Sequence, residues 1–215
     1  RAEHPTAQIR QTDGLLPQLV LRKLSEVTQG DSIIVTGVGQ HQMWAAQFCA
    51  FNEPNTLITS GGLGSMGYEV PAALGAKLGR PDKTVWSVAG DGGFQMTLCD
   101  LATAAENNIE VKFAILNNGS LGMVHQLQDL FFDQDYFASQ YTANPDFVKL
   151  AGAYGIHGIR VTAKDQVNGA IQEAMETPGP VIIDFRVVEE NVYPTIPAGK
   201  SVNDMIEEPA PEGIH

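Results

Sequence analysis

Residues 84–120 read TVWSVAGDGGFQMTLCDLATAAENNIEVKFAILNNGS and contain the same pattern twice. Each copy is an apolar run, at 84–89 and 111–116, that ends in a turn of small polar residues. A helix-like segment at 94–107 joins the two runs. Apolar runs without alternation are typical of strands buried on both faces, and strands joined by helices favour a parallel sheet. The stretch therefore predicts two neighbouring parallel strands.

The alternation of strand-like and helix-like segments continues on both sides of this stretch. Asn144-Pro145 is typical of an N-cap followed by proline at the first helical position. The pattern predicts an α/β fold with a doubly wound, mostly parallel six-stranded sheet and helices on both faces. The other strands are expected at 32–36, 56–59, 157–161 and 180–187, and the other helices between Leu15 and Val27 and at 40–50, 67–78, 120–130, 145–154 and 165–176.

Composition limits the classes to which the chain can belong. Its 215 residues include 13 Lys and Arg against 25 Asp and Glu, and the formal net charge of -12 disfavours nucleic acid as a partner. No apolar run approaches the roughly 20 residues of a membrane span, and no basic, apolar leader opens the chain, so we expect a cytoplasmic protein without a membrane partner. We expect one domain at 1–198 and a mobile tail at 199–215.

Four turns follow predicted strands, and three of them are rich in glycine. They lie at 37–41, 60–67, 90–93 and 117–120. In parallel α/β sheets, ligands bind beyond the carboxyl ends of the strands, where these turns lie. Each turn leads into a helix, and helix N-termini present free N–H groups that attract anions. The turns therefore predict a phosphate site, and a divalent cation would offset the acidic charge of the chain.

Asp91 and Asn118 are the turn residues best suited to hold that cation. Each follows one of two strands joined by a single helix, so we expect both side chains in one crevice. Carboxylate and amide oxygens, a backbone carbonyl after Asn118, diphosphate oxygens and water would complete an octahedral Mg²⁺ site. Either motif alone is more often an ordinary turn, because Gly, Asp and Asn are common in turns. The two motifs together favour the metal site.

A dinucleotide-binding pattern competes with this interpretation. The segment 62–67, GLGSMG, matches G-x-G-x-x-G between a strand and a helix, and Asp91 follows Gly67 by 24 residues. A nicotinamide-dependent oxidoreductase is therefore an alternative enzyme class. The small residues around Asp91 and the asparagines at 117–118 suit a metal and a diphosphate better. A binding module without turnover is a third alternative.

Residues 90–118 resemble the motif of thiamine diphosphate enzymes, in which a GDG triplet is followed, after the next strand, by NN. The wider chain, over residues 15–206, resembles the C-terminal, thiamine diphosphate-binding domain of the large, catalytic subunit of acetolactate (acetohydroxyacid) synthase. The segments that carry this resemblance are GQHQMWAA at 39–46, SGGLGSMG at 60–67, GMV at 122–124, NPDFVKLA at 144–151 and ENVYP at 190–194.

The resemblance implies an activity, cofactors and partners. Enzymes of this family decarboxylate pyruvate and condense the hydroxyethyl unit with a second 2-oxo acid, in branched-chain amino-acid biosynthesis. They bind thiamine diphosphate and Mg²⁺ between the subunits of a homodimer or tetramer, and FAD and a regulatory small subunit are possible in the full-length parent. The proton-relaying glutamate lies in the N-terminal domain of a partner subunit. We therefore expect no catalytic residue in this chain, which alone would be inactive.

The resemblance also implies roles for single residues in the turns. Asp91 and Asn118 would ligate Mg²⁺ through their side chains, and Ser120 would do so through its carbonyl. Gln40 and His41 would contact the diphosphate. The full set of expected cofactor-binding residues is Val38, Gly39, Gln40, His41, Gly64, Met66, Gly90, Asp91, Gly92, Gly93, Asn118, Ser120, Leu121, Gly122, Met123 and Val124.

Three of these residues, Met66, Met123 and Val124, are expected to support the chemistry. Met66 would separate the two rings of the cofactor and enforce its bent conformation, while the Gly64 carbonyl would accept from the aminopyrimidine. Val124 would face the reacting carbon, where it cannot supply a proton. A methionine near a helix start is otherwise more typical of core filling, and core packing is the less favoured alternative for Val124.

The chain departs from the family in three places. Leu127 stands where a tryptophan usually shapes the pocket of the second substrate, so the choice of second 2-oxo acid stays open. Residues 47–51 replace a more usual Phe-Tyr pair, and Tyr68-Glu69-Val70 replaces a Phe-Gly-Leu type run. A related carboligase, such as one resembling sulfoacetaldehyde acetyltransferase, is therefore a further alternative.

Overall fold

The sheet has six strands, and all of them are parallel. A computed structural model describes residues 9–207. The strands are β1 (Ser32–Thr36), β2 (Leu57–Thr59), β3 (Thr84–Gly90), β4 (Val111–Asn117), β5 (His157–Val161) and β6 (Val181–Arg186), in the order β2-β1-β3-β4-β6-β5. The predicted α/β fold is confirmed, and each expected strand lies within one residue of its predicted bounds.

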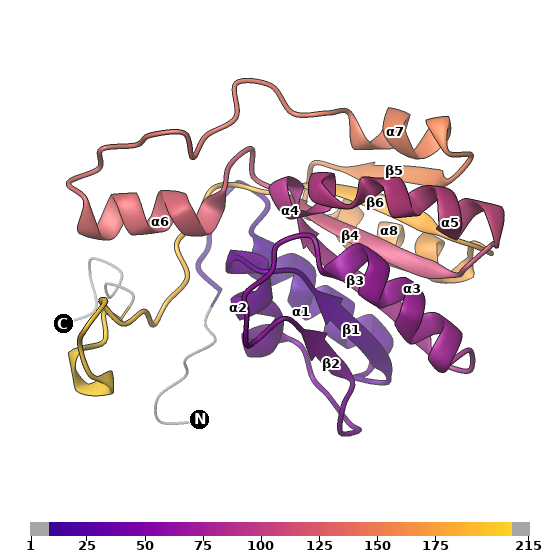
Figure 1. The fold of residues 1–215 in the computed structure, drawn as a ribbon, viewed down its shortest axis with the longest axis horizontal. Coiled ribbons are helices and arrows are strands. Elements are labelled where there is room, and N and C mark those ends of the chain that lie inside the picture. Colours follow the sequence, from indigo (N-terminus) through magenta and orange to yellow (C-terminus); the bar gives the residue numbers. More distant parts are fainter. Residues whose placement is uncertain (1–8, 208–215) are drawn as a thin grey trace.

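Helices cover both faces of the sheet (Figure 1). They are α1 (Pro17–Thr28), α2 (Gln40–Phe48), α3 (Glu69–Gly79), α4 (Asp91–Met96), α5 (Leu101–Glu106), α6 (Gly122–Phe131), α7 (Phe147–Ala153) and α8 (Gln166–Glu176), with short 3₁₀ turns η1 (Leu98–Asp100) and η2 (Val202–Asp204). Within residues 9–207, none of these helices is long and apolar enough to cross a bilayer.

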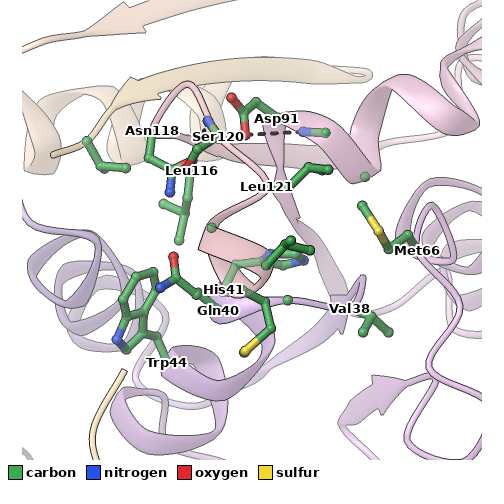
Figure 2. A pocket seen from close by; sticks show the side chains of 18 residues that line it. Val38, Gln40, His41, Trp44, Met66, Asp91, Leu116, Asn118, Ser120 and Leu121 are labelled. Carbon is green, nitrogen blue, oxygen red and sulfur yellow. Dashed lines mark hydrogen bonds between the residues drawn. The ribbon is translucent and has the colours of Figure 1, made fainter. Parts of the chain in front are cut away.

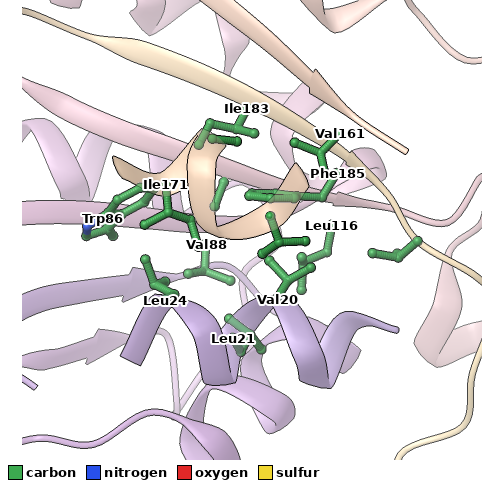
Figure 3. Close-up of a cluster of buried hydrophobic side chains, with 14 of the residues drawn as sticks. Val20, Leu21, Leu24, Trp86, Val88, Leu116, Val161, Ile171, Ile183 and Phe185 are labelled. Atoms are coloured by element: carbon green, nitrogen blue, oxygen red, sulfur yellow. The ribbon is translucent and has the colours of Figure 1, made fainter. Parts of the chain in front are cut away.

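The strands divide their side chains between two apolar cores. Trp86 and Val88 of β3 face the core that α1, α2 and α8 cover, which Figure 3 shows in part. Val85 and Ala89 of the same strand face the core that α3, α5 and α7 cover. Because both faces are covered, the central strands β1, β3 and β4 are buried along nearly their whole length, as the sequence predicts, whereas the edge strand β5 is partly exposed.

Two predicted helix features are wrong. The helix expected at 94–107 is broken into α4, η1 and α5, because the Thr97 hydroxyl donates to the Gly67 carbonyl at 2.7 Å and its backbone leaves the helical region. Asn144 does not cap α7. Asp146 does so instead, accepting from the Val148 and Lys149 N–H groups at 3.2 and 3.1 Å. Asn144 is thereby free to make other contacts.

The expected tail lies partly within the described residues. The side chains of Ser201 and Asp204 form a capping box around η2, and Thr195 pairs with Ile206 in an antiparallel bridge. Residues 208–215, like residues 1–8 of the expected domain, lie outside the described residues. The domain boundary at 198 and the mobility of the tail stay predictions.

Candidate cofactor site

The strand order reverses between β1 and β3, because β2 lies on one side of β1 and β3 lies on the other. Ligands of open α/β sheets bind at such a point, beyond the carboxyl ends of the strands. A pocket lies there, between the turns after β1, β3 and β4 (Figure 2). It is lined by Val38, Gly39, Gln40, His41, Trp44, Met66, Gly90, Asp91, Gly92, Gly93, Leu116, Asn118, Ser120, Leu121, Gly122, Met123, Val124 and Val187.

The structure brings together all of the expected cofactor-binding residues except Gly64, which does not line the pocket. Sequence reasoning missed three apolar residues: Trp44, Leu116 and Val187. Trp44 lies one helical turn after Gln40 on α2, so helical spacing could have found it. Leu116 and Val187 lie at the carboxyl ends of β4 and β6, and no chemical feature distinguishes them from core residues.

Buried polar atoms without a protein partner face this pocket. Within the described part of the chain, Gln40 Oε1, His41 Nε2 and Ser120 Oγ are buried and make no hydrogen bond. Figure 2 shows Gln40 and His41 on one side of the pocket, opposite Asp91, Asn118 and Ser120. Leaving such atoms without a partner costs about 1–3 kcal/mol each, so the pocket suits a polar ligand.

Asp91 begins α4 directly after β3, and only 1 % of its surface is exposed. Its Oδ1 accepts from the Gly92 N–H at 3.1 Å, and its Oδ2 accepts from the Gly119 N–H at 3.0 Å and from Asn144 Nδ2 at 2.5 Å. Burial raises the pKa of Asp91 to about 6, although these donors act in the opposite direction. A buried carboxylate of this kind is suited to a nearby cation.

Asn118 and Ser120 lie across the pocket from the turn after β1. Asn118 Oδ1 accepts from the Ser120 N–H at 3.2 Å, which folds the turn after β4 back on itself. No cluster of three or more His, Cys, Asp and Glu residues suited to a metal occurs in residues 9–207. The expected Mg²⁺ set contains one such residue, Asp91, beside an amide and a carbonyl, so the metal site stays a prediction.

Two glycines keep the turns close to each other. A Cβ on Gly122 would collide with Gln40 Oε1, and a Cβ on Gly92 would collide with the Tyr141 hydroxyl and lie 2.7 Å from Leu121 Cδ2. Gly122 is the first residue of α6 and Gly92 is the second residue of α4, and both helices begin at the pocket. The backbone N–H groups at these helix starts can therefore approach an anionic ligand.

His41 is buried beside the same turns. A Cβ on Gly90 would lie 3.0 Å from His41 Nδ1. Burial lowers the pKa of His41 to about 4, so the imidazole is neutral near pH 7. A neutral ring can form a hydrogen bond with a phosphate oxygen but cannot balance its charge. The negative charge of a diphosphate would therefore need a bound cation.

Glu69 is a buried acid to which the sequence analysis assigned no role in the site. It begins α3, none of its surface is exposed, and its carboxylate lies where side chains on Gly37 and Gly93 would otherwise be. Burial raises the pKa of Glu69 to about 7. Nearby backbone N–H groups, including that of Gly67, lower this pKa in part, although neither carboxylate oxygen has a hydrogen-bond partner of good geometry. The acid therefore packs under the turn that carries Asp91.

Helix α6 extends beyond the sheet (Figure 1), and two of its apolar side chains, Val124 and Leu127, are partly exposed. Their exposed fractions are 42 % and 41 %, so Val124 is not a core residue. Val124 also lines the pocket, whereas Leu127 lies about one turn further along the helix. An exposed apolar surface beside a pocket is suited to contact with a ligand or another subunit.

A family model matches the part of the chain that forms most of this pocket. Residues 37–185 match the family "Thiamine pyrophosphate enzyme, C-terminal TPP binding domain", and the chain belongs to that family. Among individual proteins, it is similar to large subunits of acetolactate synthase, as the sequence motifs indicate.

Three relatives illustrate the similarity. The chain is 43% identical to the acetolactate synthase isozyme 2 large subunit of Escherichia coli over 208 residues, which are 96% of this chain and 38% of the relative. It is 51% identical to the Corynebacterium glutamicum large subunit over 199 residues, 90% of this chain and 32% of the relative. It is 43% identical to the chloroplastic acetolactate synthase 1 of Nicotiana tabacum, covering 97% of this chain and 32% of the relative. The chain thus spans about a third of the length of these relatives.

Proposed function

We propose that the chain is the cofactor-binding domain of an acetolactate synthase, which decarboxylates pyruvate and condenses the hydroxyethyl unit with a second 2-oxo acid. The observation that carries the proposal is the pocket at the β1–β3 reversal, where polar atoms lack protein partners beside two helix starts. The family and the similarity to acetolactate synthases support the same activity. Within residues 9–207, the pocket holds donors and acceptors suited to a diphosphate with its cation.

Each group of lining residues has a separate task in this proposal. Asp91 and Asn118, with the Ser120 carbonyl, would hold Mg²⁺ through hard oxygen atoms. Gln40, neutral His41 and the N–H groups at the start of α4 would bind the diphosphate. Thiamine diphosphate, when bound, supplies the nucleophilic carbon for cleavage beside the carbonyl of a 2-oxo acid.

The residues on the other side would shape the reacting end of the pocket. Met66 would orient the rings, with the Gly64 carbonyl as an acceptor. Val124, at the open start of α6, cannot donate a proton at the reacting carbon. This favours transfer to a second substrate over release of an aldehyde. A related carboligase that uses a different second substrate is the second candidate function. It is favoured by Leu127, because this side chain beside the pocket is smaller than the tryptophan that the family usually has there.

The pocket of the single chain is incomplete in this proposal. Its cavity measures about 60 Å³ and is open on one side, whereas small-molecule pockets usually measure roughly 300–1,000 Å³. A second subunit would supply the rest, including the proton-relaying glutamate, in a homodimer or tetramer. A regulatory subunit, FAD bound outside this domain, and a cytoplasmic location are further parts of the proposal.

Asp91→Ala tests the cofactor assignment. Titration calorimetry with thiamine diphosphate and Mg²⁺ should show Mg²⁺-dependent binding by the chain and its loss in the variant, because an acidic protein would face the diphosphate without a bridging cation. Asp82→Ala, at an exposed carboxylate paired with Arg80, is the matched control and should bind normally. Unchanged affinity in Asp91→Ala, or tight NAD binding by the unaltered chain, would contradict the assignment.

A further inference from the structure

Asn144 lies outside the four turns that the sequence singles out, yet its side chain contacts the proposed metal ligand. Its Nδ2 donates to Asp91 Oδ2 at 2.5 Å and to Asn117 Oδ1 at 3.0 Å. Gln95 Nε2 approaches Asn144 Oδ1 at 3.4 Å, on the other end of the amide. Both ends of the amide are therefore engaged, and the donor end faces the carboxylate.

Buried groups beyond Asn144 determine which end of each amide points in which direction. The Asp184 carboxylate is fully buried and can only accept, so Asn117 turns its Nδ2 toward Asp184 Oδ1, at 2.9 Å. The carbonyl end of Asn117 then faces Asn144 and requires a donor there. Arg186 Nε and Arg160 Nε, at 3.0 and 3.4 Å from Asp184 Oδ2, hold the carboxylate from its other side.

We propose that Asn144 is a positioning residue for Asp91, and that Asp184, through Asn117, sets the orientation of its amide. The proposal rests on the proposed function, because it takes Asp91 as a ligand of Mg²⁺. Two donors, Asn144 Nδ2 and the Gly119 N–H, occupy Asp91 Oδ2, whereas in the described chain Oδ1 accepts from the Gly92 N–H alone. Oδ1 is therefore the oxygen with more acceptor capacity left for a cation.

Asp184→Asn tests whether Asp184, through Asn117, sets the orientation of the Asn144 amide. The substitution changes neither the size of the side chain nor the pocket. Both arginines only donate, so the new amide would turn its oxygen toward them and its NH₂ toward Asn117. Asn117 and then Asn144 would reverse, and the Asn144 oxygen would face the Asp91 carboxylate. Asn144→Ala removes the same donor directly.

The measurement is the Mg²⁺ requirement of the 215-residue chain. With thiamine diphosphate at a fixed concentration, the midpoint temperature of thermal unfolding is measured as Mg²⁺ is added, because ligand binding raises this temperature. The Mg²⁺ concentration for half of the maximal rise should increase roughly tenfold in Asn144→Ala and in Asp184→Asn, because each loses a hydrogen bond to a charged group. Asn107→Ala, at an exposed asparagine whose side-chain amide donates to the Thr103 carbonyl far from the pocket, is the control and should keep the normal requirement.

A metal-free double-mutant cycle tests the contact independently of the cofactor. Asn144→Ala should raise the unfolding equilibrium constant roughly tenfold when Asp91 is present and much less in an Asp91→Ala background. Additive effects, or an unaltered Mg²⁺ requirement in a folded Asp184→Asn variant, would overturn the proposal. If neither the unaltered chain nor a hybrid in which it replaces the matching segment of the Escherichia coli relative shows Mg²⁺-dependent binding of thiamine diphosphate, the proposed function fails. The cycle still decides whether Asn144 holds Asp91.

Discussion

Glu69 links a single buried proton to the stability of the domain. The pKa of this carboxyl rises from an ordinary 4.5 to about 7 on folding, because the group is buried. Between these two pH values, the folded protein binds a proton that the unfolded chain releases. The contribution of Glu69 to stability is therefore complete below pH 4.5 and is lost as the pH rises through 7.

Glu69→Gln should remove this pH dependence, because the amide has nearly the same shape and carries no charge. We expect the variant to be more stable than the unaltered chain by about 2–3 kcal/mol at pH 8 and to differ little at pH 4.5. Urea unfolding at the two pH values measures the difference. Glu106→Gln, at an exposed site on α5, is the control and should show no such pH-dependent gain. A gain of the same size at both pH values would show that proton binding is not the cause.

Val124→Glu tests the role of the open start of α6. A hybrid in which this chain replaces the matching segment of the Escherichia coli relative would supply the rest of an active site. A carboxyl at this position could protonate the reacting carbon, so acetaldehyde should rise relative to acetolactate. Val124→Leu is the control, since it adds bulk without a proton. An unaltered product ratio in Val124→Glu, with cofactor binding intact, would show that this position does not govern the outcome.

At the scale of single residues, sequence reasoning finds side chains whose chemistry is visible in a turn. Asp91 and Asn118 stand out because acids and amides after strands suit a cation. Asn144 and Glu69 do not stand out, because their importance comes from contacts made across the fold. The sequence motif of Asn144-Pro145 even points to a different role, that of a helix cap.

Helix α7 begins at a cap that also joins it to the neighbouring strand. The Asp146 carboxylate accepts from the Val148 and Lys149 N–H groups and forms an ion pair with Arg160 of β5. Asp146→Ala should reduce the free energy of unfolding by about 1 kcal/mol, the usual loss for a missing N-cap. Asp165→Ala is the control, because Asp165 occupies the N-cap position of α8 without a side-chain hydrogen bond. Equal urea midpoints for Asp146→Ala and the unaltered chain would contradict the capping role.

At the scale of elements, the strands are easier to predict than the helix ends. Burial on both faces makes the central strands nearly continuous apolar runs, and that signal is local. The break between α4 and α5 depends on Thr97 reaching the carbonyl of Gly67, 30 residues earlier in the chain. No local pattern carries information about such a contact.

For the whole molecule, the small and partly open pocket predicts that turnover depends on other chain segments. The purified 215-residue chain should consume pyruvate at well below the ~1–1000 per second typical of enzymes, whereas the hybrid should be active. Coupled assays of pyruvate loss on both proteins, at equal concentrations of thiamine diphosphate and Mg²⁺, test this. An isolated chain with ordinary enzymatic turnover would contradict the need for a second subunit.

The strand order also has a consequence for how the protein is made. All seven residues of β4 are buried, and one of its two neighbours is β6, which the ribosome adds 69 residues later, from Lys112 to its partner Val181. Until then, one edge of a highly apolar strand has no partner, and such edges promote aggregation. A nascent chain released before residue 181 should therefore be insoluble, and a chaperone that shields this edge should raise the yield of the complete protein.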